Sequence, residues 1–441
     1  MQRAKRVEVL DLDDRCDALV FARADADLFD PSGKSSPSRG QTLKTTIDSD
    51  VQMAVHAAID IGVTDAGLPD TESLRSAVVV LDVVTGEIIA LESRPAFALD
   101  ELSDPLVWAS AEARERRDGF THRYLNRVID GNYPPGSILK TITAAAVLET
   151  GLHDLSSRVF DYRSGSLGPR PPNGVSQLGT WHELEVAGGP PITGGNHPHL
   201  EEWVFSLEEA YAWSCNIAFS QMGLELGPDN LVDFARRFGF ERSVQVPGLG
   251  ESFSSLDNDF LLETNSRYLA ESQSNLARTA FGQGEAQVTP LQMALVAAGV
   301  ANDGVIMQPT LVRRPATDEG REGNAMQFGV FADTRLSAST VADMQRMMTA
   351  SATYGWANLA TINEANAAPG VAGKTGSAEW SEELDASHAW FIGYFPVEAP
   401  RLALAVIVER GGAGPIVAVR IANEVFGSRA VEDYLNGVGQ P

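Results

Sequence analysis

The chain has 441 residues, with 59 acidic and 34 basic side chains and a formal net charge of −25 at pH 7. Binding to nucleic acid needs a basic face, and no dense cluster of Lys and Arg appears, so we expect no nucleic-acid partner. Two cysteines and seven histidines without ligand-type spacing predict neither a disulfide framework nor a metal site, and no cofactor is expected. No run approaches the ~20 apolar residues that a membrane-spanning helix requires, and the charged start from Met1 to Asp14 is unlike a signal peptide.

The N-terminal part of the chain predicts a linker, a helix and a hairpin. Residues 1–43 are polar and acidic and end in a Ser/Pro/Gly stretch, so we expect a linker or a remnant of another domain. Apolar residues at helical spacing predict a helix from Asp50 to Ile59. The segment from Ser76 to Leu91 is predicted to be a hairpin, because two apolar runs flank the turn dipeptide Thr85-Gly86.

The middle of the chain predicts helices with clear starts and stops. Ser206 and Glu209 match a capping box, and Pro, Ser, Thr or Gly marks the ends of the other helices. Residues 161–200 are rich in Gly and Pro and predict an irregular excursion. The predicted helices run over Ser137 to Thr150, Ser206 to Ala212, Asp229 to Phe238, Pro290 to Ala298, and from Ser337 or Ser339 to Ala350.

The C-terminal part predicts three strands and one helix. The strands are expected over Ala372 to Trp380, Ala389 to Phe395 and Leu402 to Val408, followed by a single amphipathic helix from Ile416 to Tyr434. Strands at both ends with helices between them favour an α+β fold, in which the two termini build one sheet and a mostly helical subdomain is inserted.

The lysines are distributed unusually. The chain has five lysines and therefore 29 arginines, and after residue 44 the only lysines are Lys140 and Lys374. A GC-rich genome would explain arginine on the surface. It would not explain why both remaining lysines fall in short patterns where an amine is useful. Unlike a guanidinium, a lysine amine can lose its proton near neutral pH when burial or a neighbouring charge lowers its pKa.

The first of these patterns is Ser137-x-x-Lys140. The preceding Pro-Pro-Gly forces a sharp turn, which places Ser137 at or near the start of the next helix, where a tetrahedral oxyanion would be stabilised. Lys140 then lies on the same face one turn later, and a positive helix end with a second nearby cation would lower its pKa. A capping serine and a solvated lysine would produce the same pattern, so alone it is weakly specific.

Two further short patterns place polar side chains close together along the chain. Ser214-Cys215-Asn216 places a hydroxyl and a carboxamide two residues apart in what we expect to be an extended turn, with Cys215 as a small packed residue. On a strand, Lys374 and Gly376 would share one face and Thr375 and Ser377 the other, with Gly376 permitting close approach of a backbone or ligand. Each pattern alone also fits an ordinary loop or strand.

Taken together, Ser-x-x-Lys, Ser-x-Asn and Lys-Thr-Gly occur in the order seen in penicillin-binding proteins and serine β-lactamases. The chain resembles the transpeptidase domain of high-molecular-weight, class B penicillin-binding proteins over roughly residues 44–430. That resemblance implies an antiparallel sheet of about five strands with an inserted helical subdomain, and one domain over 44–441. Residues 1–43, expected to be a linker or a remnant of an N-terminal pedestal region, depart from it. Further segments similar to the family are Thr45-Thr46-Ile47-Asp48 with Gln52, Val79 to Leu91, Tyr133 to Ser137, Phe281 to Gly284, Val288 to Ala294, and His388 to Gly393.

The resemblance also implies roles for these residues. Ser137 would be the acylated nucleophile with Lys140 as its base. Ser214 would pass a proton to the leaving amine, and Asn216 would hold the donor peptide and contact Lys140. Lys374 would set the electrostatic potential of the cleft.

The remaining implied roles concern substrate binding. Thr375, Gly376 and Ser377 would line the substrate site, with Thr375, Ser377 and the Lys374 cation on the terminal carboxylate. The backbone N–H groups of Ser137 and Ser377 would form the oxyanion hole, where losing one donor typically costs ~10²–10³ in rate.

The function implied is a peptidoglycan D,D-transpeptidase of cell-wall synthesis, in cell shape or cell division. Its expected partners are stem peptides, β-lactam antibiotics and glycosyltransferases of the cell-wall machinery. It would work outside the cytoplasmic membrane, anchored by a segment absent from this chain. A D,D-carboxypeptidase, a β-lactamase and a penicillin-sensing domain are the alternatives. Of these, a class A β-lactamase is disfavoured, since no Glu-x-x-Leu-Asn-like segment lies between Ser137 and Lys374.

Overall fold

The computed structural model describes residues 44–68, 74–97, 123–161, 166–167, 183–184, 186–190, 192–193, 204–256, 265–313, 329–358, 370–381 and 386–437. The expected linker or pedestal remnant, residues 1–43, lies outside the described residues.

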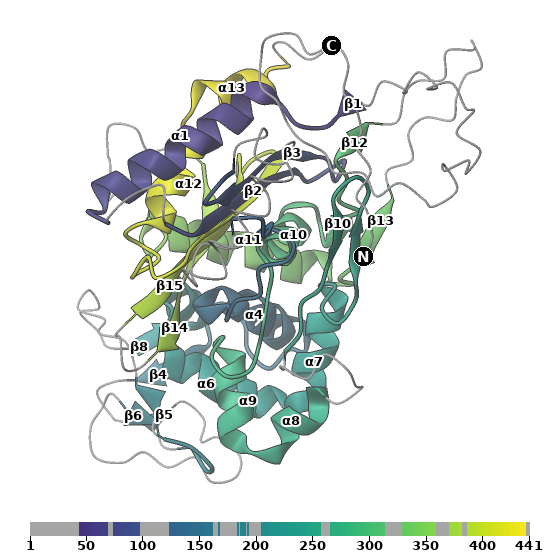
Figure 1. The fold of residues 1–441 in the computed structure, drawn as a ribbon. Coiled ribbons are helices and arrows are strands. Elements are labelled where there is room, and N and C mark those ends of the chain that lie inside the picture. Colours follow the sequence, from purple (N-terminus) through teal and green to yellow (C-terminus); the bar gives the residue numbers. More distant parts are fainter. Residues whose placement is uncertain are drawn as a thin grey trace, which may run out of the picture.

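The core of the fold is one five-stranded antiparallel sheet with the order β14-β15-β16-β2-β3 (Figure 1). The two N-terminal strands pair with the three C-terminal strands through β16 and β2, whose register runs from Leu402 opposite Asp82 to Val408 opposite Ser76. The expected sheet built from both termini is therefore confirmed. Its strands are β2 (Ser76–Asp82), β3 (Ile88–Arg94), β14 (Ala372–Ser381), β15 (Ala386–Phe395) and β16 (Leu402–Val408).

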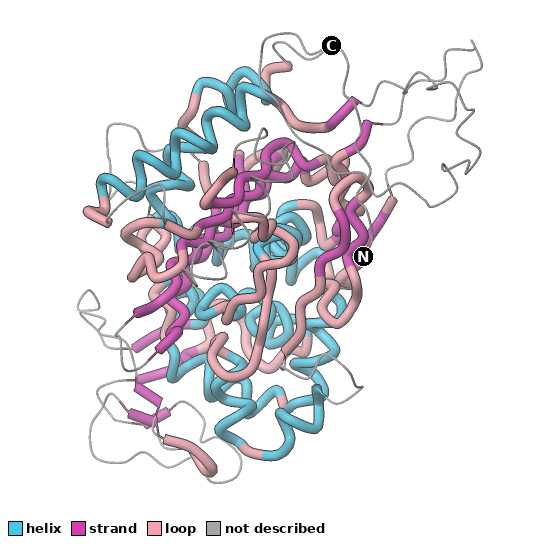
Figure 2. The backbone as a smooth tube through the Cα atoms, in the orientation of Figure 1, coloured by secondary structure: helices cyan, strands magenta, loops and turns pink. Residues whose placement is uncertain are grey.

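Every residue of β2 and β16 is buried, because helices cover both faces of the sheet. One face packs against α1 (Ser49–Asp65), α12 (Ala418–Phe426) and α13 (Arg429–Leu435) (Figures 1 and 2). Burial on both sides explains why these strands are continuous apolar runs rather than alternating ones.

The predicted single helix from Ile416 to Tyr434 is wrong. The structure has two helices there, α12 and α13, separated by Gly427 and Ser428. The Ser428 side chain caps α13 by accepting a hydrogen bond from the backbone N–H of Val431. The apolar pattern continues across the break, so periodicity alone hid this cap.

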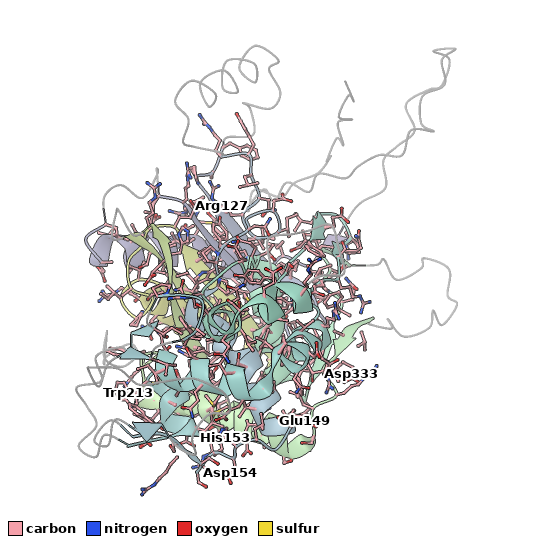
Figure 3. All side chains as sticks on the ribbon, turned by 90° about the horizontal axis from the view of Figure 1, so that it is seen from below. Arg127, Glu149, His153, Asp154, Trp213 and Asp333 are labelled. Atoms are coloured by element: carbon pink, nitrogen blue, oxygen red, sulfur yellow. The ribbon has the colours of Figure 1, made fainter. Side chains whose placement is uncertain are left out.

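The other face of the sheet lies against the helical body. Its central helix, α10, is buried along its whole length and packs on β2, β15 and β16. The 3₁₀ turn η2 leads directly into α4. Glu149, the last residue of α4, lies on a different part of the molecule from Arg127, which precedes η2 in the chain (Figure 3). The helices of this body are η2 (Gly136–Leu139), α4 (Lys140–Glu149), α5 (Leu207–Ala212), α6 (Asn216–Leu226), α7 (Pro228–Arg237), α8 (Asn265–Glu271), α9 (Gln273–Ala280), α10 (Pro290–Ala301) and α11 (Ala338–Thr353).

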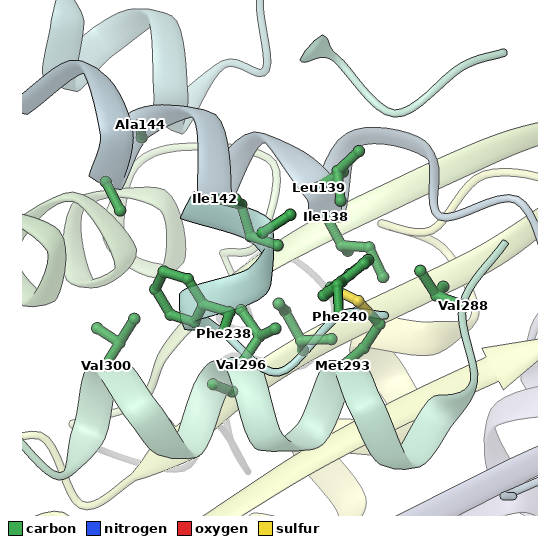
Figure 4. Packing of buried hydrophobic residues seen from close by; sticks show 14 of the residues in the cluster. Ile138, Leu139, Ile142, Ala144, Phe238, Phe240, Val288, Met293, Val296 and Val300 are labelled. Carbon is green, nitrogen blue, oxygen red and sulfur yellow. The ribbon is translucent and has the colours of Figure 1, made fainter. Parts of the chain in front are cut away.

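The beginning of α4 is fixed by the hydrophobic core beneath it. Ile138 and Ile142 on η2 and α4 face Met293 and Val296 on α10, with Phe240 between the two helices (Figure 4). All of these side chains are almost fully buried. A helix start that is packed this tightly holds its first turn in one position, and that turn carries Ser137 and Lys140.

Short strand pairs complete the described structure. In the predicted excursion over 161–200, the described pieces form short strand segments and a turn over 186–190, while most of that segment lies outside the described residues. The pairs are β1 (Lys44–Thr45) with β12 (Val312–Arg313), β9 (Val244–Val246) with β10 (Gly250–Ser252), β11 (Val305–Met307) with β13 (Val330–Asp333), β4 (Arg158–Asp161) with β5 (Ser166–Leu167) and β8 (Val204–Ser206), and β6 (Glu183–Leu184) with β7 (Ile192–Thr193).

Candidate active site

Ser137 lies in the first turn of a helix, as predicted, although that turn is 3₁₀ rather than α. Gly136 just before it has φ +56° and donates its N–H to the Gly282 carbonyl at 2.9 Å. A Cβ on Gly136 would lie only 2.9 Å from the carbonyl oxygen of Ser377. Only glycine fits here, and the consequence is that the backbones leading to Ser137 and Ser377 lie side by side.

Lys140 joins the first two patterns in one cluster. Its side chain is fully buried, and its Nζ lies 3.0 Å from Ser137 Oγ. The same nitrogen lies 2.7 Å from the Ser214 carbonyl, 3.1 Å from Ser214 Oγ and 2.7 Å from Asn216 Oδ1. Four predicted site residues are thus in direct contact around one amine.

These contacts suit a neutral amine. The Ser214 carbonyl and Asn216 Oδ1 can only accept, so they take two N–H donors, which is all that a neutral amine has. The nitrogen lone pair is then available to a serine hydroxyl, and Ser137 Oγ is at the right distance. The geometry therefore allows the Ser137 proton to pass to Lys140.

The electrostatics agree with this assignment. The pKa of Lys140 is held well below its usual value, chiefly by burial and next by the positive charge of Lys374, against a smaller opposing effect from Cys215. The second-cation half of the sequence argument is supported. Burial is the larger cause, and no residue pattern around Lys140 indicated it.

Ser214 does not lie in the extended turn that we expected. It has φ +59°, which is rare for a residue with a side chain, and Asn216 is already the first residue of α6. Hydrogen bonds from the N–H of Ser214 to the Tyr211 carbonyl (3.1 Å) and from that of Cys215 to the Ala210 carbonyl (2.8 Å) hold this bend. Because of the bend, both the carbonyl and the hydroxyl of Ser214 point at Lys140.

Lys374 lies fully buried on β14, on the face toward the helical body. Its Nζ is 5.6 Å from the centroid of the Tyr211 ring and donates to the Thr375 carbonyl at 3.1 Å. Burial lowers the pKa of Lys374 to about 7. The ring face favours a cation, so the amine is buried and yet still able to carry charge near neutral pH.

The rest of the third pattern forms the edge of the site. Gly376 packs closely, as predicted: a Cβ there would lie 3.0 Å from the Pro135 carbonyl oxygen. Ser377 is exposed, and its Oγ accepts a hydrogen bond from the Gly414 N–H at 3.1 Å. Thr375 is buried, and contact of its side chain with a substrate stays a prediction.

Some residues around the site were not singled out from the sequence. The rings of Phe219 and Phe281 lie 5.6 and 5.8 Å from Lys140 Nζ, and Trp390 Nε1 donates to the Pro134 carbonyl at 3.1 Å. Phe281 and Trp390 belong to segments noted only for family resemblance. Gly414 follows two further glycines, which was a usable signal for a close backbone approach.

Comparison with known proteins decides the family. Residues 76–427 match the penicillin binding protein transpeptidase domain. The chain belongs to this family. In this structure the Ser-x-x-Lys and Ser-x-Asn patterns meet at the Lys140 amine, and the charge of Lys374 in the Lys-Thr-Gly pattern lowers the pKa of that amine.

Individual relatives agree. The chain is 31% identical over 406 residues to the peptidoglycan D,D-transpeptidase PbpA of Mycolicibacterium smegmatis, covering 90% of this chain and 72% of that protein. The solved structure of penicillin-binding protein A from Mycobacterium tuberculosis as a penicillin G acyl-enzyme complex is similar at 28% identity and TM-score 0.69, covering 90% of this chain and 81% of that one. The D,D-transpeptidase domain from Eggerthella lenta is similar at 25% identity and TM-score 0.69, covering 91% and 84%.

Metal-binding and membrane-spanning features are absent from the described residues. Among them, no group of three or more His, Cys, Asp or Glu side chains is arranged to hold a metal ion. No helix in the described ranges is both long and apolar enough to cross a membrane.

Proposed function

We propose that this chain is a peptidoglycan D,D-transpeptidase that forms peptide cross-links through an acyl-enzyme on Ser137, and that β-lactams acylate the same serine. The observation that carries the proposal is the buried Lys140 amine, with Ser137 Oγ at 3.0 Å and two obligate acceptors on its N–H groups. The names of the PbpA relatives and the acyl-enzyme structure support the same activity.

In the first step, Ser137 Oγ attacks the carbonyl carbon of the penultimate D-alanine while its proton passes to neutral Lys140. The backbone N–H groups of Ser137 and Ser377 would bind the developing oxyanion, and the close approach of Gly136 to Ser377 supports this pairing.

The tetrahedral intermediate then loses D-alanine. The proton held by Lys140 passes through the Ser214 hydroxyl, 3.1 Å away, to the leaving amine as the C–N bond breaks. In the second half, the acceptor amine attacks the ester carbonyl, gives its proton to Lys140, and Ser137 leaves and recovers that proton. The net reaction exchanges one amide for another, so it needs no cofactor.

The remaining groups would hold the donor peptide. Asn216 Oδ1 is engaged by Lys140, which leaves its amide N–H groups to donate to a peptide carbonyl. Lys374, when charged, attracts the terminal carboxylate, and the hydroxyls of Thr375 and Ser377 would complete that site beside Gly376. The hydroxyl of Ser377 can donate while it accepts from Gly414.

The test is intact mass after incubation with penicillin G, followed over hours. A stable adduct on the wild type that is absent from Ser137→Ala supports the proposal, while Ser339→Ala, which removes an exposed hydroxyl, should label normally. Labelling of Ser137→Ala would refute the assignment, and rapid release of the adduct would indicate a β-lactamase. Supplying a donor peptide with and without an acceptor amine then separates cross-linking from D,D-carboxypeptidase hydrolysis.

We also propose that the catalytic domain spans 44–441 and works on the outer face of the cytoplasmic membrane, held by an anchor, beside a glycosyltransferase that makes the strands it links. The packing of α1 on the sheet supports including residues before the family match at 76. Labelling of intact cells with a membrane-impermeant fluorescent β-lactam tests the location, and labelling seen only after lysis would contradict it.

A further inference from the structure

A second polar cluster, partly buried, lies beside residues 133–136, the approach to Ser137. Glu409, just after β16, accepts hydrogen bonds at Oε1 from the Tyr133 hydroxyl (2.9 Å) and from Arg127 Nε (3.0 Å). Its Oε2 accepts from Arg75 at 3.3 Å, and its N–H donates to the Arg75 carbonyl at 2.8 Å. Arg127 and Tyr133 are almost completely buried.

Stability alone is a poor reason for such a cluster. Burying a charged pair costs solvation that well-packed apolar side chains would not lose, so buried ion pairs commonly contribute little net stability. The ion pairs of Glu409 join three separate parts of the fold: the start of β2, the segment before Ser137, and the end of β16. A role in holding those parts together is the better explanation, because two of them lead into the active site.

On one side the cluster fixes the nucleophile approach. Tyr133 is four residues before Ser137, and its backbone exchanges two hydrogen bonds with Val288, at 3.0 and 2.8 Å. The next residue, Pro134, accepts from Trp390, and Gly136 donates to Gly282. The hydrogen bond from the Tyr133 hydroxyl to Glu409 adds a side-chain link between this approach and the end of β16.

On the other side, Glu409 lies at the start of a glycine-rich segment, residues 410–414. After Glu409, the N–H of Arg410 donates to His388 Nδ1 at 3.1 Å and that of Gly412 to the Ser387 carbonyl at 3.0 Å. The segment then reaches Gly414, whose N–H donates to Ser377 Oγ. One carboxylate thus anchors both the approach to Ser137 and the segment that holds Ser377.

We propose that Glu409, with Tyr133 and Arg127, is a positioning network for acyl transfer, which sets the spacing between the backbone N–H groups of Ser137 and Ser377. This inference rests on the proposed function, because it assigns a role in the acylation step. None of the three residues contacts the reacting atoms. They act through the backbone segments that they hold.

The test is Tyr133→Phe, which deletes one hydroxyl and keeps the ring. A misplacement on the order of 1 Å can cost ~100-fold in rate, and a single lost tie should shift the approach by less. We expect the acylation rate constant for a chromogenic cephalosporin to fall about 10-fold or more. The dissociation constant of the pre-covalent complex should stay within about 3-fold, because the carboxylate site is untouched.

Tyr434→Phe is the matched control. The Tyr434 hydroxyl lies 3.3 Å from the Asp82 carboxylate, which is paired with Arg401, so the same chemistry recurs at the opposite end of β2. Both variants should lose similar stability, but Tyr434→Phe should acylate at the wild-type rate. Equal rates for Tyr133→Phe and Tyr434→Phe would overturn the proposal.

Glu409→Gln provides a second variant that keeps an acceptor oxygen while removing the charge. It should fall between wild type and Tyr133→Phe in acylation rate. The amide oxygen can still accept from Tyr133 and Arg127, but the amide NH2 at the Oε2 position cannot accept from Arg75. A Gln variant that acylates like wild type while Tyr133→Phe is slow would overturn the role proposed for the Glu409 charge. A wild type that is never acylated would instead refute the proposed function.

Discussion

Replacing Lys374 by methionine should make the protein more stable at neutral and acidic pH while removing most of its acylation activity. The lysine is fully buried, and burial lowers its pKa to about 7. Methionine has a similar length and flexibility and no charge to desolvate, so it fits the same space without the electrostatic penalty. The residue is thus expected to be retained for chemistry at a cost in stability.

The magnitude follows from the difference between the folded and unfolded pKa values of this lysine. An unfolded lysine titrates near 10.4, and each tenfold change in a dissociation constant corresponds to about 1.36 kcal/mol, so burying the charged form costs on the order of 5 kcal/mol. The lost attraction to the Tyr211 ring and the hydrogen bond to Thr375 reduce the net gain of the methionine variant. We expect a gain of about 2–4 kcal/mol at pH 6, after about 1–3 kcal/mol for those lost contacts.

The pH dependence is the sharper test. Between pH 7 and about 10.4 the unfolded lysine holds a proton that the folded one has released, so wild-type stability rises with pH through this window. The cost of burying the charge therefore grows as the pH falls through this window toward 7. The methionine variant has no such cost, so its stability does not share this change. Below pH 7 the folded and the unfolded lysine both hold the proton, so the cost of burying the charge no longer changes with pH.

The assay is equilibrium urea unfolding of both proteins at pH 6, 7.5 and 9. Wild-type stability should rise with pH across these points relative to the variant, so the advantage of Lys374→Met should be largest at pH 6 and shrink above 7. Removing the Lys374 charge also lets the pKa of Lys140 rise, which lowers the cost of burying that second amine and adds to the advantage of the variant at low pH. Lys44→Met, which removes an exposed lysine, is the control and should follow the wild type at every pH.

Parallel curves for wild type and Lys374→Met would refute the reasoning, as would a methionine variant that is less stable at pH 6. Either result would mean that the Lys374 ammonium is well solvated or well paired in the folded protein.

Three further predictions concern activity. The acylation rate should rise with pH through the lowered pKa of Lys140, which must be neutral, and fall through about 7 as Lys374 loses its proton; a flat profile in stopped-flow assays from pH 4 to 9 would contradict this. Lys140→Arg should be nearly as inactive as Lys140→Ala, since arginine keeps the charge and cannot accept a proton, whereas Lys374→Arg should retain more labelling than Lys374→Ala. Gly136→Ala should cost about 2 kcal/mol or more and abolish labelling, because its Cβ would meet the Ser377 carbonyl, while Gly151→Ala, at φ +70° with open space around it, should cost less and label normally.

The sheet was predictable because each of its strands has a local sequence pattern. The hairpin over Ser76 to Leu91 and the three C-terminal strands are apolar runs bounded by turn residues, and all five were placed to within a few residues. The break between α12 and α13 was missed because a glycine followed by a serine cap interrupts the backbone without interrupting the apolar pattern.

The site was predictable as a set of residues and not as a geometry. The left-handed bend at Ser214 is held by hydrogen bonds from its own N–H to the Tyr211 carbonyl and from the Cys215 N–H to the Ala210 carbonyl, and the residue type of Ser214 does not predict it. The partners of Glu409 lie up to 334 positions away in the chain, so no spacing rule could have assembled that cluster. Tertiary contacts of this kind decide burial, and burial decides the pKa of Lys140.

The pKa values of the two buried lysines, Lys140 and Lys374, are related. The charge of Lys374 is among the causes that lower the pKa of Lys140, while the pKa of Lys374 is lowered by burial alone. This asymmetry is what results if Lys140 gives up its proton first, because a neutral Lys140 then exerts no repulsion when Lys374 titrates. In the proposed mechanism, Lys140 then serves as the base while Lys374 supplies the cation over the same pH range. An arginine in place of Lys374 would preserve the cation, but an arginine in place of Lys140 would add a permanent charge and leave no base. That difference is a physical reason for a chain with 29 arginines to keep lysine at these positions.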